Sequence, residues 1–217
     1  MFIKLFLLLC KRKINLYKYY MKLTKYTMKY YFLNVATAAI LLVGCNSSTE
    51  NYIIEGKATN PKLEGRTVYM QDALNPTIRI DSVKVTNGKF KFEGKQAIPV
   101  VRELMVQEND SDIFPITLPF VLENGRIEVD LGDRVYTGNT KLNDEMMEVL
   151  MEFDRFYERD FSNMSKEDIE IAFAEMLMVE ITKHSNNIVG KYLYEGYKHK
   201  LSNKQQANAR QILRIEE

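Results

Sequence analysis

Two histidines are the residues of this chain best suited to acid–base chemistry near neutral pH. His184 and His199 each fall near the expected end of a helix. Apart from Glu180, which precedes His184 by one helical turn, neither has a ligand-type residue at helical spacing. A histidine at a helix C-terminus is favoured by the helix dipole. We therefore expect structural roles for both histidines, and the sequence predicts no catalytic residue.

A group of oxygen ligands occurs at residues 108–112, which read Glu108-Asn109-Asp110-Ser111-Asp112. Such side chains suit calcium, but the segment lacks the glycine and the distal glutamate of an EF-hand loop. A solvated hairpin loop is the simpler interpretation. Glycine-rich motifs that cradle phosphate, G-x-x-x-x-G-K and G-x-G-x-x-G, are missing from the sequence. The sequence therefore predicts no metal site and no cofactor.

The two cysteines, Cys10 and Cys45, both lie in or at the edge of the N-terminal segment. Residues 46–217 contain none. Within that range the composition excludes disulfides, thiolate metal sites and a redox Cys-x-x-Cys pair. Any chemistry of a thiol must therefore take place at the N-terminal end.

Cys45 closes the segment Leu42-Val43-Gly44-Cys45, which resembles the lipobox of bacterial lipoprotein signal peptides. An apolar stretch over residues 32–44 precedes it and is shorter than the roughly 20 residues that span a bilayer. Basic residues come before that stretch, namely Lys22, Lys25 and Lys29. Residues 45–50 then form a polar tether. We expect cleavage between Gly44 and Cys45, lipid attachment to Cys45 and a membrane as partner through this anchor.

The extent of the signal peptide depends on the translation start. Residues 1–44 are longer than the usual signal of about 15–30 residues, whereas a start at Met21 gives an ordinary length. We therefore predict Met21 as the true start. Asn46 follows the cysteine in place of the Asp that marks inner-membrane retention in some lipoproteins, so the outer membrane is favoured over the inner.

Charge is distributed unevenly along the chain. Residues 1–44 hold eight Lys or Arg and no Asp or Glu, which leaves 22 basic and 29 acidic residues and a net charge of about −7 from Cys45 onward. This acidic balance lacks the basic footprint of a nucleic-acid binder. Apolar residues make up 46% of the chain, enough for a packed core. We expect a folded domain and no nucleic-acid partner.

Residues 51–138 alternate between apolar and polar side chains and are interrupted by Gly, Pro and Asn, which predicts about seven or eight short strands. Asn87-Gly88 is the clearest turn, because both residues tolerate the positive φ of a type I′ turn. It predicts a hairpin that pairs residues 82–86 with residues 89–92. The spacing of the strands favours an antiparallel β-sandwich or open barrel.

Residues 139–217 change to helical spacing and predict a small helical subdomain, so that the fold class is α+β. Helices are expected over about 142–161, 166–184 and 188–197. Ser165-Lys166-Glu167-Asp168 resembles a capping box that opens the second of these helices, and another cap signal at 202–205 precedes a last helix. Tyr192, Tyr194 and Tyr197 could form a binding edge, although packing between helices explains them as well.

Several segments in order resemble one known family: Ile54-Glu55-Gly56, residues 65–70, Asp81-Ser82-Val83, residues 87–94, Phe120-Val121-Leu122-Glu123-Asn124-Gly125 and Tyr136-Thr137-Gly138-Asn139. The family is an uncharacterised β-rich N-terminal domain of Gram-negative envelope lipoproteins. The resemblance implies a domain that commonly precedes a thioredoxin-like thiol–disulfide interchange domain and whose own role is unknown. Because this sequence has no Cys-x-x-Cys, redox activity does not carry over.

These observations predict a membrane-anchored lipoprotein of the cell envelope with a noncatalytic binding or scaffolding role, and an envelope protein as a partner. An alternative is an accessory domain of a thiol–disulfide oxidoreductase whose thioredoxin-like domain is missing from this chain. A third hypothesis, a lipoprotein that binds glycans or peptides, depends only on the aromatic content.

Overall fold

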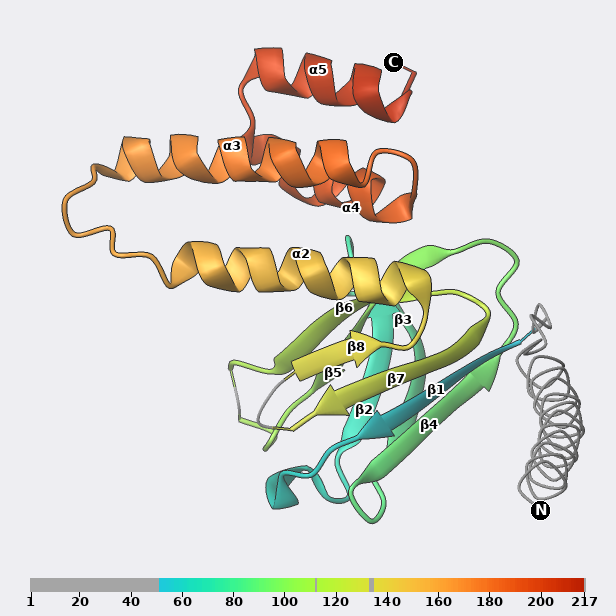
Figure 1. Ribbon diagram of the computed structural model, residues 1–217. Coiled ribbons are helices and arrows are strands. Elements are labelled where there is room, and N and C mark those ends of the chain that lie inside the picture. The colour runs from blue at the N-terminus through green and yellow to red at the C-terminus, as the bar shows by residue number, and fades with distance from the viewer. Residues whose placement is uncertain (1–50, 112, 133–134, 217) are drawn as a thin grey trace, which may run out of the picture. The chain divides into compact units, whose positions relative to one another are not determined.

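A computed structural model describes residues 51–111, 113–132 and 135–216. The predicted signal peptide, the predicted start at Met21, the predicted tether and Cys45 lie outside the described residues. The described chain forms eight strands in two sheets, followed by four α-helices (Figure 1). The strands are β1 (Tyr52–Lys57), β2 (Thr67–Asp72), β3 (Arg79–Lys84), β4 (Lys89–Gly94), β5 (Val100–Val106), β6 (Ile116–Leu122), β7 (Gly125–Leu131) and β8 (Val135–Gly138). The helices are α2 (Lys141–Tyr157), α3 (Lys166–Lys183), α4 (Ile188–Tyr197) and α5 (Asn203–Leu213), with short 3-10 turns η1 (Pro61–Leu63) and η2 (Lys198–Lys200).

The strands form a sandwich, as the alternating sequence predicts. One sheet has the order β4-β1-β7-β8 and the other β3-β2-β5-β6. Their inner faces share one apolar core, in which Ile54, Leu104, Phe120 and Ile127 are fully buried. The predicted α+β fold is therefore confirmed. One pairing departs from the expected antiparallel pattern, because β1 and β7 run parallel.

Strand β4 shows how the alternation produces this core. Phe90 and Phe92 are buried, whereas Lys89 and Lys91 are exposed on the opposite face. Successive side chains of a strand point to opposite faces, so one short sequence supplies both an apolar and a charged surface. The first sheet consequently has a buried inner face and a charged outer face.

The turn predicted at Asn87-Gly88 is present. Asn87 has φ +53° and Gly88 has φ +66°, which are the positive values that a type I′ turn requires. The amide nitrogens of Thr86 and Lys89 each donate to the carbonyl oxygen of the other residue, at 2.8 Å and 3.2 Å. The turn therefore closes with one pair of backbone hydrogen bonds.

The predicted hairpin between residues 82–86 and 89–92 is wrong beyond this single bridge. Strand β3 pairs with β2, and β4 pairs with β1 in the other sheet. The two strands separate at Val85, whose amide nitrogen donates to the carbonyl oxygen of Arg66 at 2.9 Å. The turn thus joins the two sheets at one edge of the sandwich.

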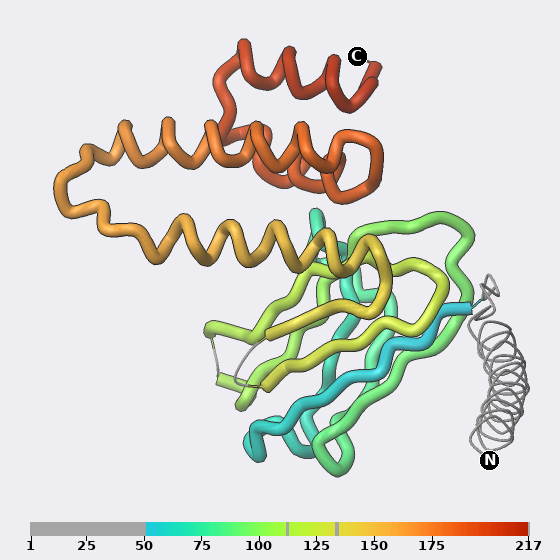
Figure 2. Tube along the Cα trace, in the orientation of Figure 1, coloured from blue at the N-terminus to red at the C-terminus, as the bar shows by residue number. Residues whose placement is uncertain are grey.

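The helices begin and end close to their predicted positions, and α2 ends four residues earlier than expected. Both predicted capping boxes are present, at Ser165 with Asp168 and at Ser202 with Gln205. A second apolar core lies among the helices and includes Val121 of β6. Helix α2 contacts β6 and β8, and α4 contacts β5, so the helices cover part of the sandwich (Figure 2). Among the described residues, no helix is both long and apolar enough to span a membrane.

Asn143, in the first turn of α2, fastens this helix to the sandwich. Its side chain is fully buried, and its Oδ1 accepts from the amide of Val121 at 2.9 Å and from the hydroxyl of Thr137 at 3.0 Å. Its Nδ2 donates to the carbonyl of Val121 and to the hydroxyl of Thr140, both at 2.8 Å. The amide of Asn143 therefore pairs with β6 as a neighbouring strand would, and it satisfies both backbone groups of Val121.

Glu103 of β5 is a partly buried carboxylate on the face that α4 approaches. Gln71 Nε2 donates to Glu103 Oε2 at 2.8 Å, and burial raises the pKa of Glu103. Burial is also the largest cause of the raised pKa values of the Tyr192 and Tyr197 hydroxyls on α4, and the charge of Glu103 adds to both. An ionised Glu103 is therefore unfavourable at this junction.

We expect Glu103→Gln to stabilise the protein at pH 7, by up to about 1 kcal/mol. A raised pKa means that the folded state holds the Glu103 proton to a higher pH than the unfolded state does. The wild type therefore loses this part of its stability as pH rises above the ordinary value of 4.5, while the amide does not titrate. Urea unfolding at pH 7 and at about pH 4 should show the advantage only at pH 7. Glu175→Gln, at an exposed site on α3, should show no such difference.

Candidate functional site

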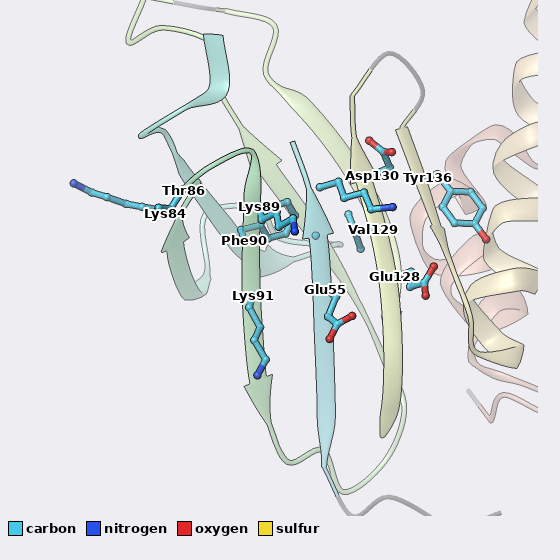
Figure 3. A pocket seen from close by; sticks show the side chains of 12 residues that line it. Glu55, Lys84, Thr86, Lys89, Phe90, Lys91, Glu128, Val129, Asp130 and Tyr136 are labelled. Carbon is cyan, nitrogen blue, oxygen red and sulfur yellow. The ribbon is translucent and has the colours of Figure 1, made fainter. Parts of the chain in front are cut away.

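A hollow with a volume of about 790 Å³ lies on the sheet β4-β1-β7-β8 (Figure 3). Charged side chains dominate its lining. The lining residues are Glu55, Gly56, Lys57, Lys84, Thr86, Lys89, Phe90, Lys91, Glu128, Val129, Asp130 and Tyr136. They come from β1, β3, β4, β7 and β8, and from the turn that follows β3.

Strand alternation positions the charged residues of the hollow. Glu55 and Lys57 are the outward residues of β1, and Lys89 and Lys91 are the outward residues of β4. Glu128 is the exposed residue at the centre of β7. The inward residues of the same strands belong to the sandwich core, so the geometry of these charges is fixed by a packed sheet.

The strand register places Lys57 and Glu55 each between an opposite charge and a like charge. The opposite charges are Asp130 beside Lys57 and Lys91 beside Glu55, and the like charges lie across the other pairing of each residue. Lys57 faces Lys89 across the antiparallel pair, and Glu55 faces Glu128 across the parallel pair. Like charges in directly opposite positions destabilise a sheet. Glu55 gains a partner in Arg126 Nη2, which lies 3.3 Å from Glu55 Oε1.

One lysine and one carboxylate of the hollow have ion-pair partners, Lys91 and Glu55. Lys91 pairs with Glu93 at 2.6 Å, and this hydrogen bond lowers the pKa of Glu93. In contrast, Lys57, Lys84 and Lys89 have no ion-pair partner within the part of the chain that the structure describes. Among the described residues, Glu128 and Asp130 of the same hollow also lack an ion pair, so the unpaired charges leave an excess of one positive charge. An anionic group of a ligand would compensate this excess.

The apolar part of the lining consists of Gly56, Phe90 and Val129. Gly56 and Phe90 lie against each other. The two residues are cross-strand partners, and a Cβ atom added at Gly56 would lie 2.0 Å from Phe90 Cζ. Phe90 itself is 5% exposed. Glycine at position 56 thus leaves room for the Phe90 ring to lie across β1, and a larger residue would displace the ring.

His184 lies at the C-terminus of α3, where the sequence places it, but it has more partners than helix capping requires. Its Nδ1 is 3.1 Å from Glu145 Oε2 of α2, and its Nε2 is 3.5 Å from Glu180 Oε2. Asn187 Nδ2 also hydrogen-bonds to Glu145 Oε2. His184 and Glu180 are both buried, at 2% and 6% exposed. This polar cluster joins α2, α3 and the start of α4.

His199 and the three tyrosines occupy different environments. His199 is exposed in η2, beside a second, smaller hollow that Tyr197 also lines. Tyr194 is buried in the helical core, and Tyr192 is packed against that core. Tyr197 thus lines this second hollow, whereas Tyr192 and Tyr194 line neither of these two hollows.

The acidic loop at residues 108–112 uses its carboxylates in ion pairs. Glu108 Oε2 lies 2.8 Å from Lys62 Nζ, and Asp110 Oδ1 lies 2.7 Å from Arg66 Nη1. Asn109 accepts hydrogen bonds from Ser111, which closes a local turn. Asp112 lies outside the described residues. Across the described ranges, no group of three His, Cys, Asp or Glu side chains is placed to hold a metal ion.

Comparison with known proteins identifies one domain. Residues 52–146 match the family model of a domain of unknown function, DUF4369. The match covers β1 to β8 and the first residues of α2, so it includes the hollow and Asn143. The predicted resemblance to an uncharacterised β-rich domain is thereby confirmed. No curated protein matches the chain.

Proposed function

We propose that this chain is a lipid-anchored protein of the cell envelope. Its residues 52–146 match a domain of unknown function, so the match itself assigns no role. The role of the chain is to bind or scaffold an envelope partner, and it does not catalyse a reaction. The anchor is on Cys45, and the outer membrane is the favoured location.

The sequence before the domain supports the anchor. Basic residues, a short apolar stretch and the segment 42–45 follow one another in the order that a lipoprotein signal requires. A single lipid chain holds a protein to a membrane only weakly, whereas several chains on one cysteine hold it stably. The polar residues 46–50 then separate the anchor from β1.

The observation that carries the binding role is the pair Lys57 and Lys89 in the charged hollow. The two lysines face each other on adjacent strands without an ion-pair partner among the described residues. Two like charges in opposite positions destabilise the sheet. An anion that binds over the two strands would compensate them. An anionic segment of an envelope partner is therefore the class of ligand that fits this hollow.

We expect the double variant Lys57→Gln/Lys89→Gln to bind polyglutamate and polyphosphate at least fivefold more weakly than the wild type does. Loss of two positive charges should also reduce the salt dependence of binding. Titration of the mature protein in nanodiscs at two salt concentrations measures both effects. The variant Lys191→Gln/Lys204→Gln removes two exposed charges from α4 and α5 and should bind like the wild type.

Equal binding by both double variants would contradict the binding role of the hollow. Reproducible turnover of hydrolase or isomerase substrates, independent of added thiol, would contradict the noncatalytic role. Both measurements use the same purified protein.

The alternative role is that of an accessory domain for a thiol–disulfide oxidoreductase. It is supported by the match to the domain of unknown function together with the family resemblance described above. Sequencing the DNA that follows codon 217 separates the two proposals. An adjoining reading frame for a thioredoxin-like domain would favour the accessory role.

A further inference from the structure

A second hollow, of about 230 Å³, lies in the helical part of the chain. Its walls are aromatic and aliphatic, and its polar residues are Glu170, His199 and Lys200. The walls are formed by Phe156, Tyr157, Ile169, Phe173 and Tyr197. They come from the C-terminal end of α2, from α3 and from the end of α4, so this hollow shares no residue with the charged hollow on the sheet.

The aromatic rings of this hollow surround Phe173. Its ring centroid lies 5.4 Å from that of Phe156, 6.0 Å from that of Tyr157 and 6.2 Å from that of Tyr197. Phe173 is 7% exposed, whereas Tyr157 is 66% exposed. Tyr157 is therefore a wall of the hollow that remains largely in contact with solvent. Met164, in the connection between α2 and α3, is a further exposed apolar residue, at 40%.

The size of the hollow indicates what it can hold. Pockets for cofactors and drug-sized ligands range from roughly 300 to 1,000 Å³, and this hollow is smaller. One large apolar side chain is a better match. Anchor residues of protein interfaces occupy such pockets, which have apolar walls and a polar rim.

The rim indicates the charge of the occupant. Lys198 pairs with Glu195 at 2.8 Å, and Glu170 lies 3.8 Å from Lys166. Lys200 has no ion-pair partner in the described part of the chain and is exposed, as is His199 beside it. The uncompensated charge at the rim is therefore basic, although the domain as a whole is acidic.

We propose that this hollow binds one large apolar side chain of a protein partner, next to an acidic residue that meets Lys200. The apolar side chain packs on Phe173 between Tyr157 and Tyr197, and the carboxylate lies at the rim. This site is separate from the charged hollow and does not depend on the function proposed for it.

The chain has no tryptophan, so a tryptophan peptide can be excited selectively as the probe. With mature protein in phosphatidylcholine nanodiscs, acetyl-Asp-Trp-Asp-amide should show a saturable blue shift that empty nanodiscs do not produce. Tyr157→Ala should weaken this binding at least threefold without unfolding the chain, because Tyr157 is mainly exposed. Acetyl-Asp-Ala-Asp-amide should not compete for the site.

Charge reversal gives the decisive comparison. Lys200→Glu should weaken binding of the Asp-Trp-Asp peptide at least threefold and strengthen binding of acetyl-Lys-Trp-Lys-amide. Lys204→Glu, at an exposed position of α5 that lines neither hollow, should change neither affinity. The proposal is overturned if the wild type gives no saturable shift, or if Lys200→Glu leaves the preference unchanged. Binding of a neutral oligosaccharide through Tyr157, with no peptide binding, would also overturn it.

Discussion

Replacing Cys45 by Ser is expected to abolish incorporation of labelled palmitate and to leave the precursor uncleaved. The proposed lipid attachment requires the nucleophilic sulfur of Cys45, and a serine hydroxyl does not replace a thiolate at neutral pH. The fraction of the protein that sediments with outer membranes and resists alkaline carbonate should fall accordingly. The loss of palmitate incorporation should be complete, because the sulfur of Cys45 is the one proposed attachment point.

The chain offers a matched control for this experiment in its other cysteine. Cys10→Ser should incorporate as much palmitate as the wild type, because a start at Met21 removes Cys10 from the translated chain. Both variants should retain the folded domain, since residues 46–217 contain no cysteine. Palmitate in the Cys45→Ser variant would contradict the anchor. An N-terminal peptide from residues 1–20 would contradict the start at Met21.

Replacing Asn143 by Leu should lower the free energy of unfolding by about 2–4 kcal/mol. Leucine has a similar size, but it removes both hydrogen bonds to the backbone of Val121, at 2.9 Å and 2.8 Å. Val121 is fully buried, so its N–H and C=O groups would lose their side-chain partner in an environment that excludes water. Urea unfolding followed by circular dichroism measures the change.

Two further variants separate the hydrogen bonds from the volume of the side chain. Asn143→Asp keeps the acceptors but removes the two donated bonds and brings a charge to the carbonyl of Val121, so it should also be strongly destabilising. Asn208→Leu, at an exposed position on α5, should change stability by a few tenths of a kcal/mol. If Asn143→Asp were as stable as the wild type, the two hydrogen bonds that Asn143 Nδ2 donates would contribute little to stability.

Local patterns in the sequence were sufficient to predict the elements of the fold. The turn at Asn87-Gly88 and the caps at Ser165 and Ser202 depend on neighbouring residues, and all three are present. The partner of β4 was predicted wrongly, because a turn fixes only the residues that flank it. Which strand pairs beyond that turn depends on the packing of two whole sheets.

Contacts between residues distant in the sequence could not be predicted. Asn143 resembles any polar residue near a helix N-terminus, and its partner Val121 lies in β6. The neighbour of His184 across the helices, Glu145, belongs to α2. Neither pair leaves a local pattern, so an alignment that shows covariation would have been needed to find them.

The charged hollow could have been found in part. Alternation along β1 and β4 predicts which side chains share the outer face, and it places Lys57 and Lys89 there. Their direct opposition follows from the register of β1 with β4, which the predicted hairpin had assigned differently. The aromatic hollow combines α2, α3 and α4 and was beyond a single sequence.

The parallel pairing of β1 with β7 has a consequence for the order of folding. Ile54 pairs with Ile127, about 70 residues later in the chain, whereas β5 and β6 are joined by a short loop. Pairings of long sequence separation form late, because a large loop must be closed before any contact is gained. Strand β1 lies between β4 and β7, so its sheet cannot be completed until β7 is available. Synthesis of residues up to about 131 must therefore precede the closure of the sandwich, whereas the four strands of the other sheet are all available once Leu122 has been added.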